Sequence, residues 1–313
     1  MSPHPIGVPT PPPGPLGGLP LGSPWALHRP TDPCPHPPPP PRLPHVYVTL
    51  IAAAALWGAA TGLLVPRAAY RLAVEPEEAW RAACPAGHPF AGPARGWLGT
   101  ARCARCAAVV GVTASVRTPD GASHHRSAPA PYAPTVRPAA VTAVVCVLLA
   151  AATGVRPELG VWLLLAPFGV LLAVVDRRVH RLPDVLTLPL AGATAALLGL
   201  AELLPGDGGS WPTALLGGVS LGGGYFLLFL INPNGMGFGD VKLAVALGTA
   251  LGWYGWPVFF AGAFAGFLFG AAYGFGLVVL RRAGRRTAIP FGPFMIAGTL
   301  AGLVLGALAT SAV

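Results

Sequence analysis

Long apolar runs separated by short polar loops dominate the hydropathy pattern of the chain. Most of these runs approach the ~20 residues that a helix needs to cross the hydrocarbon core of a bilayer. They cover about residues 46–65, 139–155, 159–175, 185–204, 211–231, 241–253, 257–280 and 288–312. The pattern predicts an all-α polytopic membrane protein with about eight transmembrane helices. The sixth run is short and has Lys242 near its start, so we expect this helix to be tilted, half-inserted or merged with its neighbour.

Two polar segments interrupt the pattern near the N-terminus. Residues 1–45 hold 18 prolines, and a chain of this composition cannot pack a core, so we expect a disordered tail. The tail is either a partner-binding segment or a dispensable extension. The first transmembrane helix then covers residues 46–66, and residues 67–137 form a small polar insert. The remaining spans, residues 138–313, form one transmembrane bundle.

Composition supports a membrane protein and excludes several soluble classes. The chain is 53% hydrophobic and 10% charged, with a mean hydropathy of +0.61, whereas soluble domains carry about 25% charged residues. A soluble dinucleotide-binding enzyme and a nucleic-acid module are excluded. Five cysteines are too few and too clustered for a disulfide-stapled secreted domain.

The net charge of +9 indicates membrane topology. Basic residues follow the first, third, fifth and seventh runs, so every second loop is basic, and short basic loops stay cytoplasmic. They are Arg67, Arg71, Arg81, Arg177, Arg178, Arg181, Lys242, Arg281, Arg282, Arg285 and Arg286. We therefore expect a multi-pass protein of the cytoplasmic membrane, surrounded by membrane lipid and with no nucleic-acid partner. Its insert faces the cytoplasm, and both termini lie outside.

Two acidic residues stand at the predicted cytoplasmic ends of spans. Asp176 ends the third span and Asp240 begins the sixth, and helix parity places both on one face of the membrane. Taken alone, an aspartate at a helix end is usually a cap or a solvated loop charge. However, Gly235, Gly237 and Gly239 alternate directly before Asp240, and glycine allows another backbone to approach closely. Such access suits a peptide substrate.

Four blocks of the sequence together resemble the type IV prepilin peptidases, which are intramembrane aspartyl proteases with a GxGD motif. Residues 237–240 read GFGD, within a similar longer stretch 236–243. Residues 176–189 resemble the block of the first aspartate, with its PD and LTLP elements. Residues 289–294 resemble the PFGPF element, and residues 58–72 resemble the first helix, which ends in Arg-Leu. GxGD alone would be a weak signal, but the combination is specific.

The resemblance implies an aspartyl dyad of Asp176 and Asp240 that removes leader peptides from type IV prepilins or pseudopilins. Two adjacent carboxyls share one proton, so one polarises the scissile carbonyl while the other activates water, and no cofactor is needed. Gly237, Gly239 and Lys242 belong to the same motif, and Pro183 and Asp184 belong to the first block. Asp184 is the competing acid, but its place after Pro183 predicts an N-terminal helix cap.

The insert contains a candidate structural zinc site. Cys84 and His88 precede a CxxC pair formed by Cys103 and Cys106, which gives a Cys3His set for tetrahedral zinc. The resembled bacterial enzymes carry two CxxC pairs, and here Gly87 stands where the second cysteine of the first pair is expected. Either His88 replaces it or the insert is a partly vestigial loop with inert thiols.

The resemblance also implies a second activity, methylation, for many members of the family. Many bacterial members also methylate the new pilin N-terminus with S-adenosylmethionine, but residues 90–100 lack the polar stretch associated with it. We therefore do not expect methylation, and S-adenosylmethionine is a cofactor only if that activity is retained.

Two rival functions are compatible with parts of the sequence. One is a catalytically silent scaffold or transporter with close-packed glycine-rich helices, and the other is a presenilin-type protease. The latter's Tyr-Asp motif is missing, because Val175 precedes Asp176.

Overall fold

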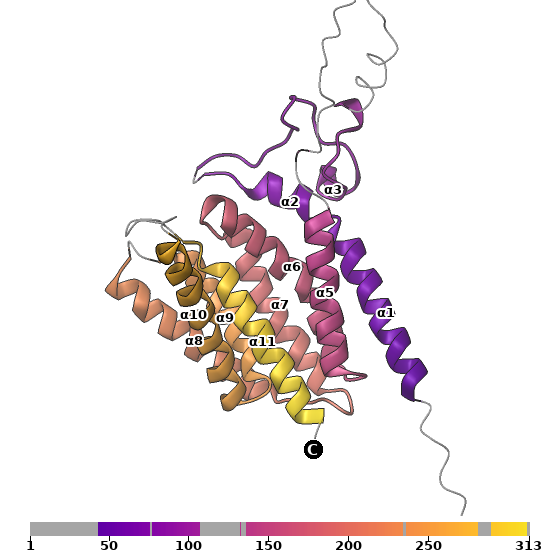
Figure 1. Ribbon diagram of the computed structural model, residues 1–313, viewed down its shortest axis with the longest axis vertical. Helices are drawn as coiled ribbons and strands as arrows, with labels where there is room; N and C mark the ends of the chain where they lie inside the picture. The colour runs from indigo at the N-terminus through magenta and orange to yellow at the C-terminus, as the bar shows by residue number, and fades with distance from the viewer. Residues whose placement is uncertain are drawn as a thin grey trace, which may run out of the picture. The chain divides into compact units, whose positions relative to one another are not determined.

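Every regular element in the described part of the computed structural model is a helix, which confirms the all-α prediction (Figure 1). The structure describes residues 43–75, 77–106, 132, 136–233, 236–280 and 289–311. The helices are α1 (Leu43–Gly62), α2 (Val65–Leu72), α3 (Pro93–Gly96), α5 (Val136–Thr153), α6 (Glu158–Val179), α7 (Asp184–Glu202), α8 (Trp211–Ile231), α9 (Phe238–Gly252), α10 (Trp256–Val279) and α11 (Gly292–Ser311).

The predicted segment boundaries shift slightly at the N-terminal side. Helix α1 begins within the predicted tail, and the rest of that tail lies outside the described residues. Helix α2 occupies the first residues of the predicted insert, and α1 and α2 together form one apolar stretch long enough to span a membrane. The described remainder of the insert contains α3 and an isolated bridge between Ala83 and Pro89.

Helix α9 corresponds to the sixth predicted run, the one expected to be short. In the described residues, seven helical segments are long and apolar enough to span a membrane, and α9 is not among them. Its 15 residues extend only about 22 Å, less than the ~30 Å hydrocarbon core. Helix α9 nevertheless runs from the end of α8 toward the start of α10 (Figure 1). It packs against α7, α8, α10 and α11, so it need not match the lipid thickness itself.

Glycines allow α9 to lie close against α8. A Cβ on Gly217 of α8 would overlap the carbonyl oxygen of Gly248 in α9, and a Cβ on Gly248 would overlap the carbonyl oxygen of Gly217. A Cβ on Gly252 would overlap the backbone of Thr213. Small residues permit this close backbone approach between membrane helices. The close contact fixes the position of α9, which carries Asp240.

We expect Gly217→Ala to destabilise the bundle, because the added methyl meets backbone atoms that cannot rotate away. Overpacking of this kind costs about 1–3 kcal/mol, so the midpoint of thermal unfolding in detergent should fall measurably. Gly224→Ala in the same helix is the control, since a Cβ there has no neighbour within 4 Å. Equal midpoints for the two variants would contradict the close packing of α8 and α9.

Helix α1 is anchored to α6 at a proline. Pro167 lies inside α6 and has no N–H to donate to the carbonyl of Leu163, one turn earlier. The indole nitrogen of Trp57 donates a hydrogen bond to that carbonyl over 2.8 Å. The hydroxyl of Tyr47 likewise donates to the carbonyl of Ala151 in α5. Polar groups of α1 thus satisfy backbone atoms of the bundle, where unpaired atoms would be costly in lipid.

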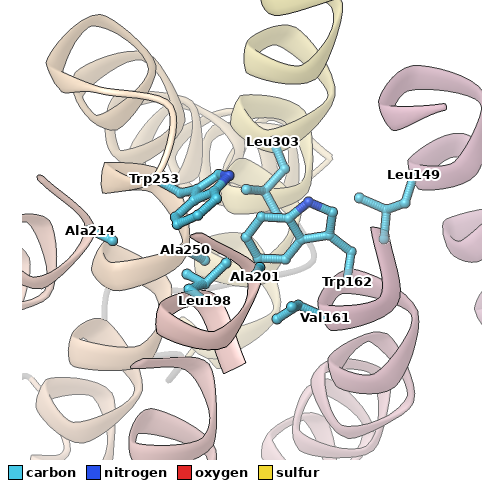
Figure 2. Packing of buried hydrophobic residues seen from close by; sticks show 9 residues of the cluster. All are labelled: Leu149, Val161, Trp162, Leu198, Ala201, Ala214, Ala250, Trp253 and Leu303. Carbon is cyan, nitrogen blue, oxygen red and sulfur yellow. The ribbon is translucent and has the colours of Figure 1, made fainter. Parts of the chain in front are cut away.

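Four clusters of buried hydrophobic residues occur in the described part of the chain, and the two largest lie along the bundle. In the first, Trp162 of α6 lies between Leu149 of α5 and Leu303 of α11 (Figure 2). The second includes Leu182, Leu243 and residues of α6, α8 and α11. It packs beside the segments that carry the two predicted catalytic aspartates.

Candidate active site

The two aspartates lie at the same end of the bundle, as helix parity predicts. Asp176 is in the last turn of α6, and its residue is only 3% exposed. The helix ends just beyond it, because His180 adopts a left-handed conformation and donates its N–H to the Asp176 carbonyl over 2.8 Å. Asp240 is the third residue of α9 and is half-buried. The loop that follows Asp176 lies directly against the start of α9, because a Cβ on Gly239 would lie 2.9 Å from Cβ of Leu182.

Asp176 receives a hydrogen bond that the sequence did not predict. The backbone N–H of Gly292, the first residue of α11, donates to Oδ2 of Asp176 over 3.0 Å. A Cβ on Gly292 would lie 2.8 Å from the same oxygen, closer than real Cβ contacts. A side chain at position 292 would therefore force the Asp176 carboxyl or the start of α11 to shift. The only sequence signal for this contact is the motif at residues 289–294, which contains Gly292 but does not show which residue it contacts.

The glycines before Asp240 do not all have the same role. A Cβ on Gly239 would lie 2.9 Å from Cβ and 3.1 Å from the carbonyl oxygen of Leu182, so Gly239 permits the predicted close approach of another backbone. Gly237 has an ordinary φ of −75°, and a Cβ there would meet Asp240 Oδ2 at 3.6 Å, an ordinary contact. Gly235 lies outside the described residues. Gly237 is the N-cap of α9, so Asp240 is not a cap.

The prediction that Asp184 caps α7 is wrong. Pro183 occupies the N-cap position with an extended backbone, and no side chain caps the helix. Asp184 instead forms an ion pair with Lys242, with 2.6 Å between Oδ2 and Nζ. The Lys242 ammonium also lies 4.8 Å from the ring centre of Phe238. An N-cap is the residue just before the first helical position, whereas Asp184 is the first residue of α7. Its carboxyl therefore does not cap the helix and instead joins α7 to α9.

The structure gathers the four predicted metal ligands into one cluster. The Sγ atoms of Cys84, Cys103 and Cys106 and Nδ1 of His88 all lie within 4.8 Å of one another. The Cys84 and Cys106 sulfurs are 3.8 Å apart, and Nδ1 lies 3.3–3.7 Å from the three sulfurs. A tetrahedral zinc places two sulfurs roughly 3.8 Å apart and a sulfur and a nitrogen roughly 3.5 Å apart. The donors therefore fit zinc in both type and spacing.

Local backbone features shape this cluster. Residues Cys84 to His88 form a tight turn in which the N–H of Cys84 donates to the carbonyl of His88 over 2.9 Å. Gly87 has a φ of +80° in that turn, where a cysteine would be strained. The backbone N–H of Cys106 donates to the Cys103 sulfur and, as the largest cause, lowers the pKa of the Cys103 thiol, whereas desolvation raises the pKa of the neighbouring Cys106 thiol. A thiolate at neutral pH is the form that binds metal.

Buried arginines attach the cluster to α2. The guanidinium of Arg71 lies 3.8 Å from the ring centre of Trp97 and donates to the carbonyl of Arg81. Arg67 donates to the carbonyl of Ala91 over 2.9 Å and lies 4.8 Å from the ring centre of Phe90. These contacts hold the described part of the insert directly against the helix that continues α1.

Comparison with known proteins agrees with the sequence blocks. Residues 163–275 match the type IV leader peptidase family, and this range includes Asp176, Asp184 and Asp240. The chain is similar to proteins named prepilin leader peptidase/N-methyltransferase. It is 36% identical to that of Aeromonas salmonicida over 150 residues, 45% of this chain and 46% of the relative. It is 38% identical to that of Pseudomonas aeruginosa over 146 residues, 44% of this chain and 48% of the relative. The resemblance to type IV prepilin peptidases is thereby confirmed.

The matches have a limited extent. The chain spans about half the length of the curated relatives it matches, including a relative from Burkholderia pseudomallei, 36% identical over 156 residues. No solved structure matches the chain significantly.

Proposed function

We propose that this protein is an aspartic endopeptidase of the cytoplasmic membrane that removes the leader peptide from type IV prepilins or pseudopilins. The observation that carries the proposal is that Asp176, in the last turn of α6, and Asp240, in the first turn of α9, lie at the same end of the bundle, where Gly239 packs against Leu182. The family match across both aspartates supports the reaction class. The positive-inside pattern of the loops supports a site that faces the cytoplasm.

In the proposed mechanism the dyad holds one proton. Asp176, oriented by the N–H of Gly292, acts as the base and takes a proton from water as the water oxygen attacks the scissile carbonyl carbon. The proton of Asp240 passes to the carbonyl oxygen. The tetrahedral intermediate then collapses: the C–N bond breaks, and the leaving nitrogen receives the proton from Asp176. The intermediate's hydroxyl returns its proton to Asp240, and the dyad is restored.

The rival functions are less well supported by the site. A transporter needs polar groups near the middle of the membrane, whereas both aspartates lie at one end of the bundle. The glycine contacts of α8 and α9 would suit a silent scaffold, but they do not explain why the Gly292 N–H is directed at a buried carboxyl.

The proposal is tested by incubating the full chain in proteoliposomes with a purified prepilin and analysing the product by mass spectrometry. We expect a single cut that releases the leader, and a new pilin N-terminus of unmodified mass even when S-adenosylmethionine is present. A prepilin left intact would refute the peptidase. A product heavier by one methyl group would refute only the expectation that methylation is absent.

We further propose that Cys84, His88, Cys103 and Cys106 hold one structural zinc, which would fix the fold of the insert. Purified protein should contain about one zinc per chain, measured by elemental analysis. The double variant Cys103→Ser/Cys106→Ser should lose it, because serine hydroxyls are poor zinc ligands. His88→Cys should keep it. Cys146→Ser is the control, since Cys146 is buried in α5 outside the cluster. A zinc content near zero in the wild-type protein would favour the vestigial loop.

A further inference from the structure

An apolar groove runs through the bundle beside the proposed catalytic site. Its volume is about 430 Å³, and it is lined by residues of α5, α6, α7, α9 and α11. One end contains Arg137, Arg177 and Pro293, and the other contains Leu149, Trp162 and Leu303. Figure 2 shows the Trp162 side chain between those of Leu149 and Leu303. We call this feature the α5–α11 groove.

The length of the groove suits an extended acyl chain. From Arg177 to Trp162 the α6 axis rises about 22 Å, more than half of the ~30 Å hydrocarbon core. The lining between these two residues is almost entirely apolar. The groove therefore matches a hydrocarbon chain in both length and polarity.

The charges at the mouth indicate the other part of the ligand. Arg137 is the second residue of α5, and Arg177 is in the last turn of the antiparallel neighbour α6. Both are exposed, and among the described residues neither forms an ion pair with an acidic side chain. Asp176 adjoins Arg177 in sequence, but its Oδ2 accepts from Gly292. Guanidinium groups bind phosphate through paired hydrogen bonds.

We propose that the α5–α11 groove binds one anionic phospholipid. Its phosphate lies between Arg137 and Arg177, and one acyl chain follows the groove toward Trp162. The arginines lie at the end of the bundle that the positive-inside pattern places in the cytoplasm, where anionic lipids are concentrated. A free phosphate would leave the apolar groove empty. This inference requires only the membrane location and does not depend on the peptidase activity.

The site adjoins the proposed dyad at two points. Arg177 follows Asp176, and Pro293 follows Gly292, whose N–H binds the Asp176 carboxyl. A phospholipid in the groove would therefore contact the end of α6 and the start of α11 together. Its binding would favour the arrangement in which these two segments are adjacent.

The test uses the full chain in phosphatidylcholine nanodiscs that contain a phosphatidylglycerol with a photoactivatable acyl chain. Cross-linked residues are mapped by mass spectrometry, and we expect them deep in the groove, at Trp162, Leu247 or Ile296. The double variant Arg137→Gln/Arg177→Gln should reduce this labelling about 10-fold or more, since each basic residue near a membrane surface contributes about 1 kcal/mol of attraction to anionic lipid. The matching lysine variant should restore most of it.

Arg178→Gln is the matched control, because Arg178 is the next residue of α6 and does not line the groove. Its labelling should equal that of the wild type.

Two labelling results would overturn the proposal. One is labelling confined to lipid-facing residues outside the groove. The other is labelling of the Arg137→Gln/Arg177→Gln variant that equals that of the wild type. Competition by millimolar inorganic phosphate would instead indicate a free-phosphate site. Displacement by a prepilin peptide would assign the groove to the substrate; either result would overturn the lipid assignment. Labelling requires no catalysis, so failure of the peptidase assay would not affect it.

Discussion

Gly292→Ala is expected to reduce leader cleavage about 100-fold while the protein still inserts and folds. The added Cβ would lie 2.8 Å from Oδ2 of Asp176, so either the carboxyl or the start of α11 must move. Movement in either direction breaks the 3.0 Å hydrogen bond from the Gly292 N–H. A displacement approaching 1 Å at a catalytic group can cost about 10²-fold in rate. The measurement is the rate of prepilin cleavage in proteoliposomes.

The control for this variant is Gly276→Ala. Gly276 lies in α10, and a Cβ there has no neighbour within 4 Å, so its activity should match that of the wild type. Thermal unfolding of both variants separates a local effect on Asp176 from general destabilisation. If Gly292→Ala cleaved at the wild-type rate, the close contact between α11 and Asp176 would be irrelevant to the reaction.

Features that depend on local composition were predictable from the sequence. Hydropathy located the membrane helices because each span needs a long apolar run. Helix parity then placed Asp176 and Asp240 at the same end. The Cys/His spacing predicted a cluster, since ligands in two short turns can converge on one metal.

Features that depend on packing between distant segments were not predictable. The hydrogen bond from Gly292 to Asp176 joins residues 116 positions apart, and only the folded bundle brings them together. The Asp184–Lys242 ion pair likewise depends on how α7 packs against α9. The sequence around Asp184 is compatible with a cap as well as with this pair. The function of the short helix α9 also follows from its neighbours, which enclose it.

Asp176→Asn and Asp240→Asn are each expected to reduce cleavage at least about 100-fold. Asparagine retains the size and much of the hydrogen bonding of aspartate, but it can neither accept a proton from water nor share one with its partner. Because the two carboxyls of the proposed dyad would act as one unit, loss of either should be nearly as severe as loss of both. Membrane insertion and thermal unfolding should change little, since asparagine has the size of aspartate and keeps its packing contacts.

Asp184→Asn is the matched control for these two variants. Asp184 is an aspartate of the same loop region, its side chain is 62% exposed, and it pairs with Lys242. An exposed pair contributes up to about 1 kcal/mol, so Asp184→Asn should lower the rate no more than about fivefold.

The most direct test is therefore the initial rate of leader removal from one prepilin by wild-type protein and the Asp176→Asn, Asp240→Asn and Asp184→Asn variants in proteoliposomes. The proposed dyad predicts near-zero rates for the first two variants and a rate within about fivefold of wild type for the third. If Asp176→Asn cleaved normally and Asp184→Asn did not cleave, the first catalytic aspartate would be Asp184 and not Asp176. Normal cleavage by both Asp176→Asn and Asp240→Asn would contradict the aspartyl mechanism itself.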